Sequence, residues 1–489
     1  MSSNDPQLHV IFLPYMAPGH MMPMVDMARL FAARGVKVTI ITTTMNALLF
    51  QNAVDRDINS GRQIALEILR LPTAEFGLPE GCENISSTTT PEMTVKLFQA
   101  IAMLQQPMEQ LLHERRPNCI VADIFFPWTT DVAAELGIPR LVFNGGGFFY
   151  LCVKECIELY APHNSVASET ETFAVPGIPH QIELTRSQLP DIVKAKNEFS
   201  ALFDRIKDAE RRSHGVLMNS FYELEPSYVD QYKQFVGIKA WDVGPVSLSN
   251  RDTTEKADRG NRASITEHKC LSWLDSKEPN SVLYVCFGSL TRFSTAQHLE
   301  IATALEASGC PFIWVVGKVL KSTKGREEDE WWLPEGFEAR MMEGKKGLII
   351  RGWAPQVLIL DHQAIGGFLT HCGWNSILEG VSAGVPLITW PLFAEQFFNE
   401  KLITQVLKIG VGVGNKFWSA WATEDVELVK REDIEKAVSM VMDDGDDAKE
   451  MRKRAKQLGE MAKMAVEEGG SSYANITTLI EDIRLCERK

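Results

Sequence analysis

Residues 366–383 read GGFLTHCGWNSILEGVSA, a short apolar run that passes through a tight turn into a helical pattern. The first five residues suit one buried strand, and a helix over 377–383 follows the turn. Free backbone N–H groups and the positive end of a helix macrodipole meet at such a turn, and both favour an anion. His371, Asn375 and Ser376 add side-chain donors there. The turn therefore predicts a site for a diphosphate that requires no metal.

Other interpretations of this region account for less of it. Asn375 or Ser376 could serve only as a helix cap, but a cap explains neither His371 nor the close backbone approach at Gly373. Three glycines at 410, 412 and 414 resemble part of a dinucleotide fingerprint, yet no convincing helix follows them. The chain contains neither a G-x-x-x-x-G-K-[ST] phosphate loop nor an H-E-x-x-H metal motif. We therefore expect no metal and no resident cofactor.

Strand-like runs and helical patterns alternate along the whole chain. In the first half, strand-like runs occupy residues 9–13, 36–42, 119–122 and 141–143. After a polar, turn-rich stretch they resume at 281–287, 312–316 and 347–351. This alternation predicts an α/β fold with two Rossmann-like domains that face a central cleft, since ligands bind beyond the carboxyl ends of parallel strands. We expect a first domain, a linker, a second domain and a closing helix at 1–246, 247–268, 269–465 and 466–489.

The composition limits the class of protein. The chain has 489 residues, of which 45% are hydrophobic and 23% charged, so it can bury the cores of two domains. Its formal net charge is −14 and the acidic residues are dispersed, which argues against nucleic-acid or anionic-membrane partners. Nine scattered cysteines indicate reduced thiols, and no apolar run reaches the roughly 18 residues of a membrane span. We expect a cytoplasmic monomer that binds small molecules.

Two residues with acid–base chemistry follow predicted strands of the first domain. His20 ends the loop at 14–20, where a helix starts, and Asp123 comes directly after the strand at 119–122. Taken alone, His20 suits a surface or capping residue, and Asp123 suits a helix cap. Together they suit a general base and the carboxylate that orients and charge-balances it. We therefore predict a catalytic pair.

The segment 353–396 resembles the 44-residue signature box of plant family 1 UDP-glycosyltransferases, which act on secondary products. The likeness rests on WAPQ at 353–356, HCGWNS at 371–376, EG at 379–380, GVP at 384–386, WP at 390–391 and EQ at 395–396. PGH at 18–20 also agrees, and the likeness covers essentially the whole chain. It implies the GT-B fold, with an acceptor-binding first domain, a UDP-sugar-binding second domain and a last helix that returns to the first domain.

The resemblance also implies roles for single residues. Trp353 would stack on the uracil ring beside the backbone of Ala354, and the ribose hydroxyls would be held by Gln356 and Glu379. The diphosphate would contact Ser289, His371, Asn375 and Ser376. The sugar would contact Trp374, Glu395 and Gln396.

Two features of the sequence bear on the identity of the donor sugar: the last residue of the box, and one difference from the residues that relatives commonly carry. In this family a terminal glutamine is associated with glucose and a histidine with galactose, so Gln396 favours UDP-glucose. Residues 143–149 read FNGGGFF, whereas relatives commonly carry Thr or Ser in place of Gly146 or Gly147. That hydroxyl often touches the sugar. Its absence would admit a sugar with a different substituent at the sixth carbon, or a water molecule.

The implied reaction is inverting transfer of glucose to a hydroxyl or carboxyl of an apolar plant secondary metabolite. His20 would accept the proton of the acceptor, and Asp123 would stabilise the resulting imidazolium. Candidate acceptor contacts are Met16, Phe126 and Phe148. The likeness is greatest to a branch with triterpenoid, steroid and flavonoid glucosyltransferases. We favour a triterpenoid or steroidal aglycone, as in saponin biosynthesis, over a flavonoid or other phenolic.

Two other classes of protein stay open at this point. A non-catalytic nucleotide-sugar-binding protein would keep the donor box but would not require His20 and Asp123. A nicotinamide-dependent oxidoreductase would share the Rossmann architecture, but it should show a complete glycine fingerprint with a downstream acid. Binding of NADH to the protein would support the oxidoreductase alternative.

Overall fold

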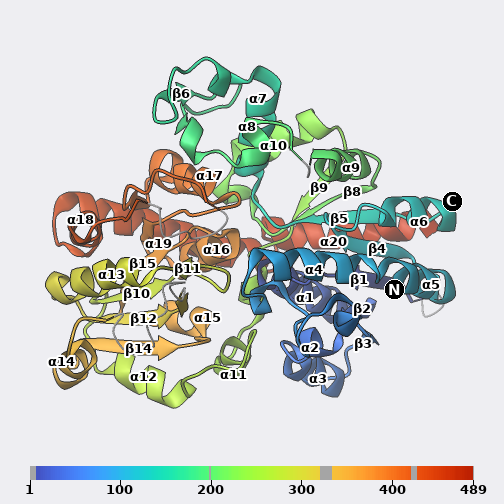
Figure 1. The fold of residues 1–489 in the computed structure, drawn as a ribbon. Helices are drawn as coiled ribbons and strands as arrows, with labels where there is room; N and C mark the ends of the chain where they lie inside the picture. The colour runs from blue at the N-terminus through green and yellow to red at the C-terminus, as the bar shows by residue number, and fades with distance from the viewer. Residues whose placement is uncertain (1–6, 198–199, 320–332, 420–426, 488–489) are drawn as a thin grey trace. The chain divides into compact units, whose positions relative to one another are not determined.

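Two parallel sheets organise the chain in the computed structural model, which describes residues 7–197, 200–319, 333–419 and 427–487 (Figure 1). By its internal contacts the chain divides into two units. Unit 1 comprises Met1–Gly147, Glu198–Arg262 and Met464–Lys489, and unit 2 comprises Phe148–Asn197 and Ala263–Lys463. Each unit contains one of the two large parallel sheets, so the predicted α/β class is confirmed.

The sheet of unit 1 has seven parallel strands in the order β3-β2-β1-β4-β5-β8-β9. The strands are β1 (His9–Leu13), β2 (Lys37–Thr43), β3 (Ile64–Leu69), β4 (Cys119–Asp123), β5 (Arg140–Asn144), β8 (Gly215–Met218) and β9 (Lys239–Asp242). The strand order changes direction between the neighbouring strands β1 and β4. The loops after these two strands therefore begin side by side and then separate. Such a switch point is where open α/β sheets bind ligands.

Strand β1 is buried on both faces, which explains its unbroken apolar sequence. Val10 and Phe12 pack into a core with α1 (Pro18–Ala33). Ile11 and Leu13 point to the opposite face, in a core with α4 (Pro91–Ala102) and α5 (Gln105–Arg115). Helix α20 (Ser471–Glu487) joins the first core through Ile476, Leu479, Ile480 and Ile483. The last helix is therefore part of unit 1, although it follows unit 2 in the chain.

The sheet of unit 2 has six parallel strands in the order β14-β12-β10-β15-β16-β17. The strands are β10 (Val282–Cys286), β12 (Phe312–Val316), β14 (Gly347–Arg351), β15 (Ile365–Thr370), β16 (Leu387–Thr389) and β17 (Gly410–Gly412). Here the order reverses between β10 and β15, which places the loops after these strands next to each other. Helix α16 (Trp374–Ala383) begins earlier than the predicted helix at 377–383.

The units differ from the expected domains at 1–246 and 269–465. The segment Phe148–Asn197 groups with unit 2. There α7 (Phe148–Tyr160) packs against α17 (Gln396–Lys401). The ring centroids of Tyr150 and Phe398 lie 5.4 Å apart. Local sequence pattern does not contain this information, because the contact joins residues that are far apart in the chain.

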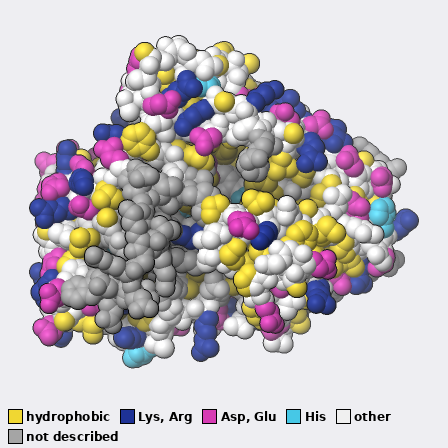
Figure 2. All heavy atoms as spheres, viewed as in Figure 1, with side chains coloured by type: hydrophobic (Ala, Val, Ile, Leu, Met, Phe, Trp, Pro, Cys, Tyr) yellow, Lys and Arg dark blue, Asp and Glu magenta, His cyan; other side chains and the backbone are white. Residues whose placement is uncertain are grey.

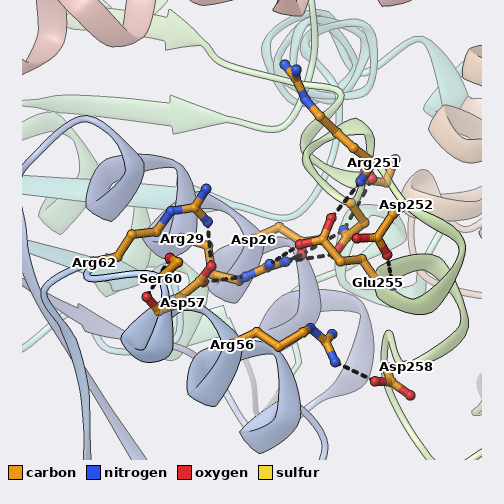
Figure 3. Close-up of polar contacts among 12 residues, drawn as sticks. Asp26, Arg29, Arg56, Asp57, Ser60, Arg62, Arg251, Asp252, Glu255 and Asp258 are labelled. Carbon is orange, nitrogen blue, oxygen red and sulfur yellow. Dashed lines mark hydrogen bonds and ion pairs between the residues drawn. The ribbon is translucent and has the colours of Figure 1, made fainter.

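A buried network of charged side chains attaches the first part of the expected linker, 247–268, to unit 1 (Figure 3). The guanidinium of Arg29 on α1 is 3% exposed and donates to Asp57 at 2.7 Å, Asn250 at 2.7 Å and Glu255 at 2.9 Å. Further pairs are Arg62 with Asp57, Arg259 with Asp26, and Arg56 with Asp258. The network joins α1, α3 (Gln51–Asn59) and α11 (Thr253–Ala257).

The exposed surface carries charges of both signs. On the face in Figure 2, acidic and basic side chains are interspersed among the residues that the structure describes. None of the nine cysteines, all of which lie in the described ranges, forms a disulfide, and all except Cys310 and Cys486 are buried. None of the helices within the described ranges has the length and hydrophobicity needed to cross a membrane.

Candidate active site

The structure brings His20 and Asp123 together at the switch point of the first sheet. His20 lies in the first turn of α1, directly after the loop that follows β1, and Asp123 is the last residue of the neighbouring strand β4. The His20 Nδ1 and Asp123 Oδ2 atoms are 2.8 Å apart. Asp123 is fully buried, whereas the His20 side chain is 25% exposed. The exposed partner is therefore the imidazole, which is the group that would meet a substrate.

Neighbouring groups hold both members of this pair in place. The backbone N–H of Phe125 donates to Asp123 Oδ1 at 3.0 Å, so both carboxylate oxygens accept a hydrogen bond. Rings of Tyr15 and Phe125 flank the imidazole, with centroids 6.2 and 5.5 Å from it. A Cβ atom at Gly145 would lie 3.1 Å from His20 Cε1, so this position has little room for a side chain. Burial, helped by the Asp123 carboxylate, raises the pKa of Tyr15, which keeps its hydroxyl protonated.

The three predicted acceptor contacts are all buried. Met16 and Phe126 belong to the unit 1 core on the α4 side of the sheet, and Phe148 has no exposed surface in unit 2. Burial of this degree favours a packing role for each of them. Phe125, which directly precedes Phe126, is partly exposed and lies beside His20. The apolar pattern alone could not separate these two phenylalanines, because the turn after β4 decides which ring points into the core.

In unit 2, the predicted diphosphate turn has a tightly held histidine at its centre. A Cβ atom at Gly288, after β10, would lie 2.6 Å from the His371 ring, and one at Gly373 would lie 2.5 Å from it. His371 Nδ1 is buried without a hydrogen-bond partner among the described residues. Burial lowers the pKa of His371 to about 4, so the ring is neutral at physiological pH. It can therefore offer a phosphate a hydrogen bond but no positive charge.

Three of the predicted donor residues form one hydrogen-bonded group. Gln356 Nε2 donates to Glu379 Oε2 at 2.7 Å and to Ser376 Oγ at 3.1 Å. The hydroxyl of Tyr284, fully buried on β10, donates to Gln356 Oε1 at 3.2 Å. Sequence analysis missed Tyr284, because its position inside a buried strand predicts packing only.

The remaining predicted donor contacts lie in segments that follow strands of the unit 2 sheet. Trp353 follows Gly352, whose φ of +107° is a conformation that glycine favours, and the Trp353 carbonyl accepts from Ser264 N at 2.9 Å. Trp374 opens α16 and is 2% exposed, which favours packing for its ring. Among the other predicted contacts, Ser289 lies in the turn after β10, Ala354 follows Trp353, Asn375 lies in the first turn of α16, and Glu395 directly precedes α17.

The side chain of Gln396 takes part in the loop that precedes it. Its Oε1 accepts from the backbone N–H groups of Leu392 at 2.8 Å and Phe393 at 3.0 Å. The amide oxygen is thus engaged by the protein, and the amide nitrogen is the part of this side chain suited to donate to a sugar hydroxyl. The signature box predicts that this residue contacts the sugar, but it does not show which atom of the side chain is available.

The structure also bears on chemistry other than nucleotide-sugar transfer. Residues 380–384 read GVSAG and match a G-x-S-x-G pattern, but Ser382 lies inside α16 and donates to Leu378 O at 2.6 Å. A nucleophile elbow would place its serine on a turn between a strand and a helix. In the described ranges, no group of three or more His, Cys, Asp or Glu side chains could hold a metal ion.

Two doubly wound domains, each with a switch point that carries polar side chains, are typical of the GT-B class of glycosyltransferases. Residues 262–454 match the family described as UDP-glucoronosyl and UDP-glucosyl transferase, and residues 6–248 match the glycosyltransferase N-terminal domain. This chain belongs to the plant family 1 UDP-glycosyltransferases, and it is an enzyme of that class.

Similar proteins span the full length of the chain. A scopoletin glucosyltransferase of Nicotiana tabacum is 52% identical over 98% of both chains. A UDP-glucose flavonoid 3-O-glucosyltransferase of Fragaria ananassa is also 52% identical, over 98% of this chain and 96% of its own. The crystal structure of Glycyrrhiza uralensis UGT73P12 complexed with glycyrrhetinic acid 3-O-monoglucuronide superposes with a TM-score of 0.93, at 48% identity, over 98% of this chain and 96% of that one. These likenesses confirm the family and the GT-B fold that the signature box implied.

Proposed function

We propose that this enzyme is an inverting glucosyltransferase that uses His20 as its general base and UDP-glucose as its donor. The observation that carries the proposal is the 2.8 Å hydrogen bond between His20 Nδ1 and Asp123 Oδ2. A carboxylate at Nδ1 keeps the proton on that nitrogen, so Nε2 is the basic atom of the ring. Partial exposure of the imidazole gives an acceptor a route to it.

The reaction then follows from the chemistry of these groups. His20 Nε2 takes the proton of an acceptor hydroxyl while the hydroxyl oxygen forms a bond to the anomeric carbon. The bond from that carbon to the diphosphate oxygen breaks, and UDP departs with the bonding electrons. Attack opposite the leaving group inverts the anomeric configuration. Asp123 stabilises the imidazolium until its proton passes to solvent, and an acceptor carboxylate would need no base.

The donor proposal rests on residues of unit 2. Gln356 and Glu379, already hydrogen-bonded to each other, would turn toward the ribose hydroxyls, and His371, Ser376 and the start of α16 would hold the diphosphate. Gln396 supports glucose, as does the name of the Fragaria ananassa relative. Gly146 and Gly147 leave a different UDP-sugar as the alternative donor, since neither brings a hydroxyl.

For the acceptor we favour a triterpenoid or steroidal aglycone. Support comes from the Glycyrrhiza uralensis enzyme, whose bound glycyrrhetinic acid glucuronide is a triterpenoid glycoside. A phenolic acceptor is the second candidate, because the tobacco and strawberry relatives are named for scopoletin and flavonoid substrates. The partly exposed ring of Phe125 beside His20 also suits stacking on an aromatic acceptor.

A transfer assay followed by mass spectrometry tests donor and acceptor together. UDP-glucose, UDP-galactose and UDP-glucuronic acid would each be offered with triterpenoid, steroid and flavonoid acceptors. We expect a mass gain of one hexose with UDP-glucose on the triterpenoid or steroid set. Products on flavonoids alone would select the phenolic candidate. UDP binding without any product would favour a nucleotide-sugar-binding protein instead.

The general base can be tested by His20→Ala. We expect kcat to fall by about 10²–10⁴-fold, the usual contribution of a general base, with the affinity for UDP unchanged because the donor residues belong to unit 2. His113→Ala, on an exposed histidine of unit 1, serves as the matched control and should retain wild-type turnover. Wild-type kcat in His20→Ala would show that another group accepts the proton.

A further inference from the structure

Residues 391–395 belong to the loop between β16 and α17, and most of their polar backbone groups form hydrogen bonds. Two of its N–H groups, at Leu392 and Phe393, bind the side-chain oxygen of Gln396. The Phe393 carbonyl accepts from Gln396 N at 3.2 Å. The position of the Gln396 amide is therefore coupled to the path of this loop.

One residue of the loop has an unfavourable backbone conformation. Ala394 has a φ of +53°, in the left-handed region that residues with a side chain seldom occupy. Such a conformation persists only where the surroundings hold it. One contact of this residue comes from Trp418, whose indole Nε1 donates to the Ala394 carbonyl at 3.1 Å.

The segment around Trp418 runs along the loop and binds it at two further points. Asn415 Nδ2 donates to the Pro391 carbonyl at 2.6 Å. Ser419 N donates to the Leu392 carbonyl at 2.9 Å. Three donors of residues 415–419 therefore engage three carbonyls of the loop that leads into Gln396.

A second segment, at residues 185–187, binds the segment at 415–419. Ser187 is buried, its hydroxyl donates to the Lys416 carbonyl at 2.8 Å, and its own carbonyl accepts from Trp418 N at 2.9 Å. Thr185 Oγ1 lies 2.9 Å from Ser187 Oγ and completes the arrangement. All of these residues belong to unit 2, so the contacts lie within one unit.

We propose that Trp418 and Ser187 are positioning residues that set the donor-sugar specificity of this enzyme by holding the loop 391–394 and, through it, the amide of Gln396. The inference rests on the proposed contact of Gln396 with the sugar. Neither residue is among the predicted substrate contacts, and neither lies within the signature box at 353–396. The sugar-binding end of the donor site thus depends on residues from two segments outside that box.

The test is Trp418→Phe, which keeps an aromatic ring and removes the indole N–H. We expect the KM for UDP-glucose to rise about threefold to tenfold, as for the loss of one hydrogen bond, and the preference for UDP-glucose over UDP-galactose to fall by a similar factor. Affinity for UDP, which has no sugar, should not change. Trp273→Phe, on α12 (Glu267–Asp275), is the matched control and should alter none of these values.

Two more variants separate loop positioning from general damage. Ser187→Ala should change sugar preference in the same direction, since it removes the bond to Lys416. Ala394→Gly, added to Trp418→Phe, should restore part of the preference, because glycine adopts a positive φ without strain.

The outcomes distinguish this inference from the proposed function. If wild-type enzyme transfers no sugar from any donor, the proposed function fails whatever the variants do. If wild-type enzyme is active and Trp418→Phe keeps its KM and sugar preference, the positioning role is wrong. Equal losses of affinity for UDP and UDP-glucose would also overturn it, because they would indicate damage to the whole donor site.

Discussion

Single hydrogen bonds determine which atoms of the site residues are available for chemistry. Because the Asp123 carboxylate accepts the hydrogen bond from His20 Nδ1, it favours the tautomer with the proton on that nitrogen. The amide of Gln356 is oriented in a similar way, since its oxygen accepts from Tyr284 and its nitrogen donates to Glu379. Both cases place a predicted site residue under the control of a buried neighbour. The role of such a neighbour can be measured by removing one polar atom.

Tyr284→Phe removes the hydroxyl that orients Gln356. We expect the Kd for UDP and for UDP-glucose to rise together, by about 2–12-fold, which corresponds to roughly 0.5–1.5 kcal/mol for one hydrogen bond. Isothermal titration calorimetry gives both values. The same change at Tyr228, which is buried in unit 1, should leave donor affinity unaffected. An unchanged Kd for the Tyr284 variant would mean that Gln356 is oriented by other contacts.

Asp242 is a buried carboxyl whose Oδ2 atom has no hydrogen-bond partner among the described residues. Burial raises the pKa of the Asp242 carboxyl above the usual value. At neutral pH the buried charge therefore destabilises the folded protein. This destabilisation disappears as the pH falls through the pKa of the folded state. Asp242→Asn should therefore raise the free energy of unfolding at pH 7 by about 1 kcal/mol, with a smaller gain in acid. Thermal unfolding at several pH values measures this.

The control for Asp242→Asn is Asp230→Asn, since Asp230 is exposed on α10 (Pro226–Val236). It should change the stability little at any pH. A gain for Asp242→Asn that stays constant from neutral to acid pH would show that ionisation of this carboxyl is not the cause.

At the scale of elements, ion pairs and hydrogen bonds join residues 250–259 to helices α1 and α3 of the first unit. Residues 247–262 look like a linker in sequence because they are polar, yet Arg29 binds Asn250 and Glu255 from within α1. Polar composition predicts a solvated segment when no partner is known. The partners here come from α1 and α3, more than 190 residues earlier.

Arg29→Met tests this network. It removes a buried cation and leaves Asp57 and Asp26 with less compensation, so we expect a loss of about 3–5 kcal/mol in the stability of unit 1. Arg56→Met breaks a pair whose side chains are about one-third exposed, and its cost should be at most about 1 kcal/mol. Urea unfolding of the two variants gives the comparison. Equal losses would show that burial does not set the strength of these pairs.

At the scale of the whole molecule, the chain leaves unit 1, builds unit 2 and returns to the core of unit 1. Helix α20 places Leu479 in that core with no exposed surface, whereas Leu485 on the same helix is 57% exposed. The stability of the first unit therefore depends on the end of the chain. A protein that unfolded its last helix would lose packing around β1 and α1.

Leu479→Ala should lower the free energy of unfolding by about 2–5 kcal/mol, since it leaves a cavity in a closed core. Leu485→Ala is the matched control on the exposed side of α20, and it should change stability by less than about 0.5 kcal/mol. Differential scanning calorimetry of both variants measures the effect. Equivalent melting temperatures would show that α20 does not support the core of unit 1.

The alternation of strands and helices and the contact between His20 and Asp123 could be predicted from the sequence. Apolar periodicity and the turn after a strand are local, and parallel strands bring the ends of their loops to one edge of a sheet. Three features needed the folded chain: the grouping of Phe148–Asn197 with unit 2, the burial of Met16 and Phe126, and the contacts of Trp418 with the loop before Gln396. Each depends on packing between segments far apart in the chain, and such packing leaves no periodic pattern in the amino-acid sequence.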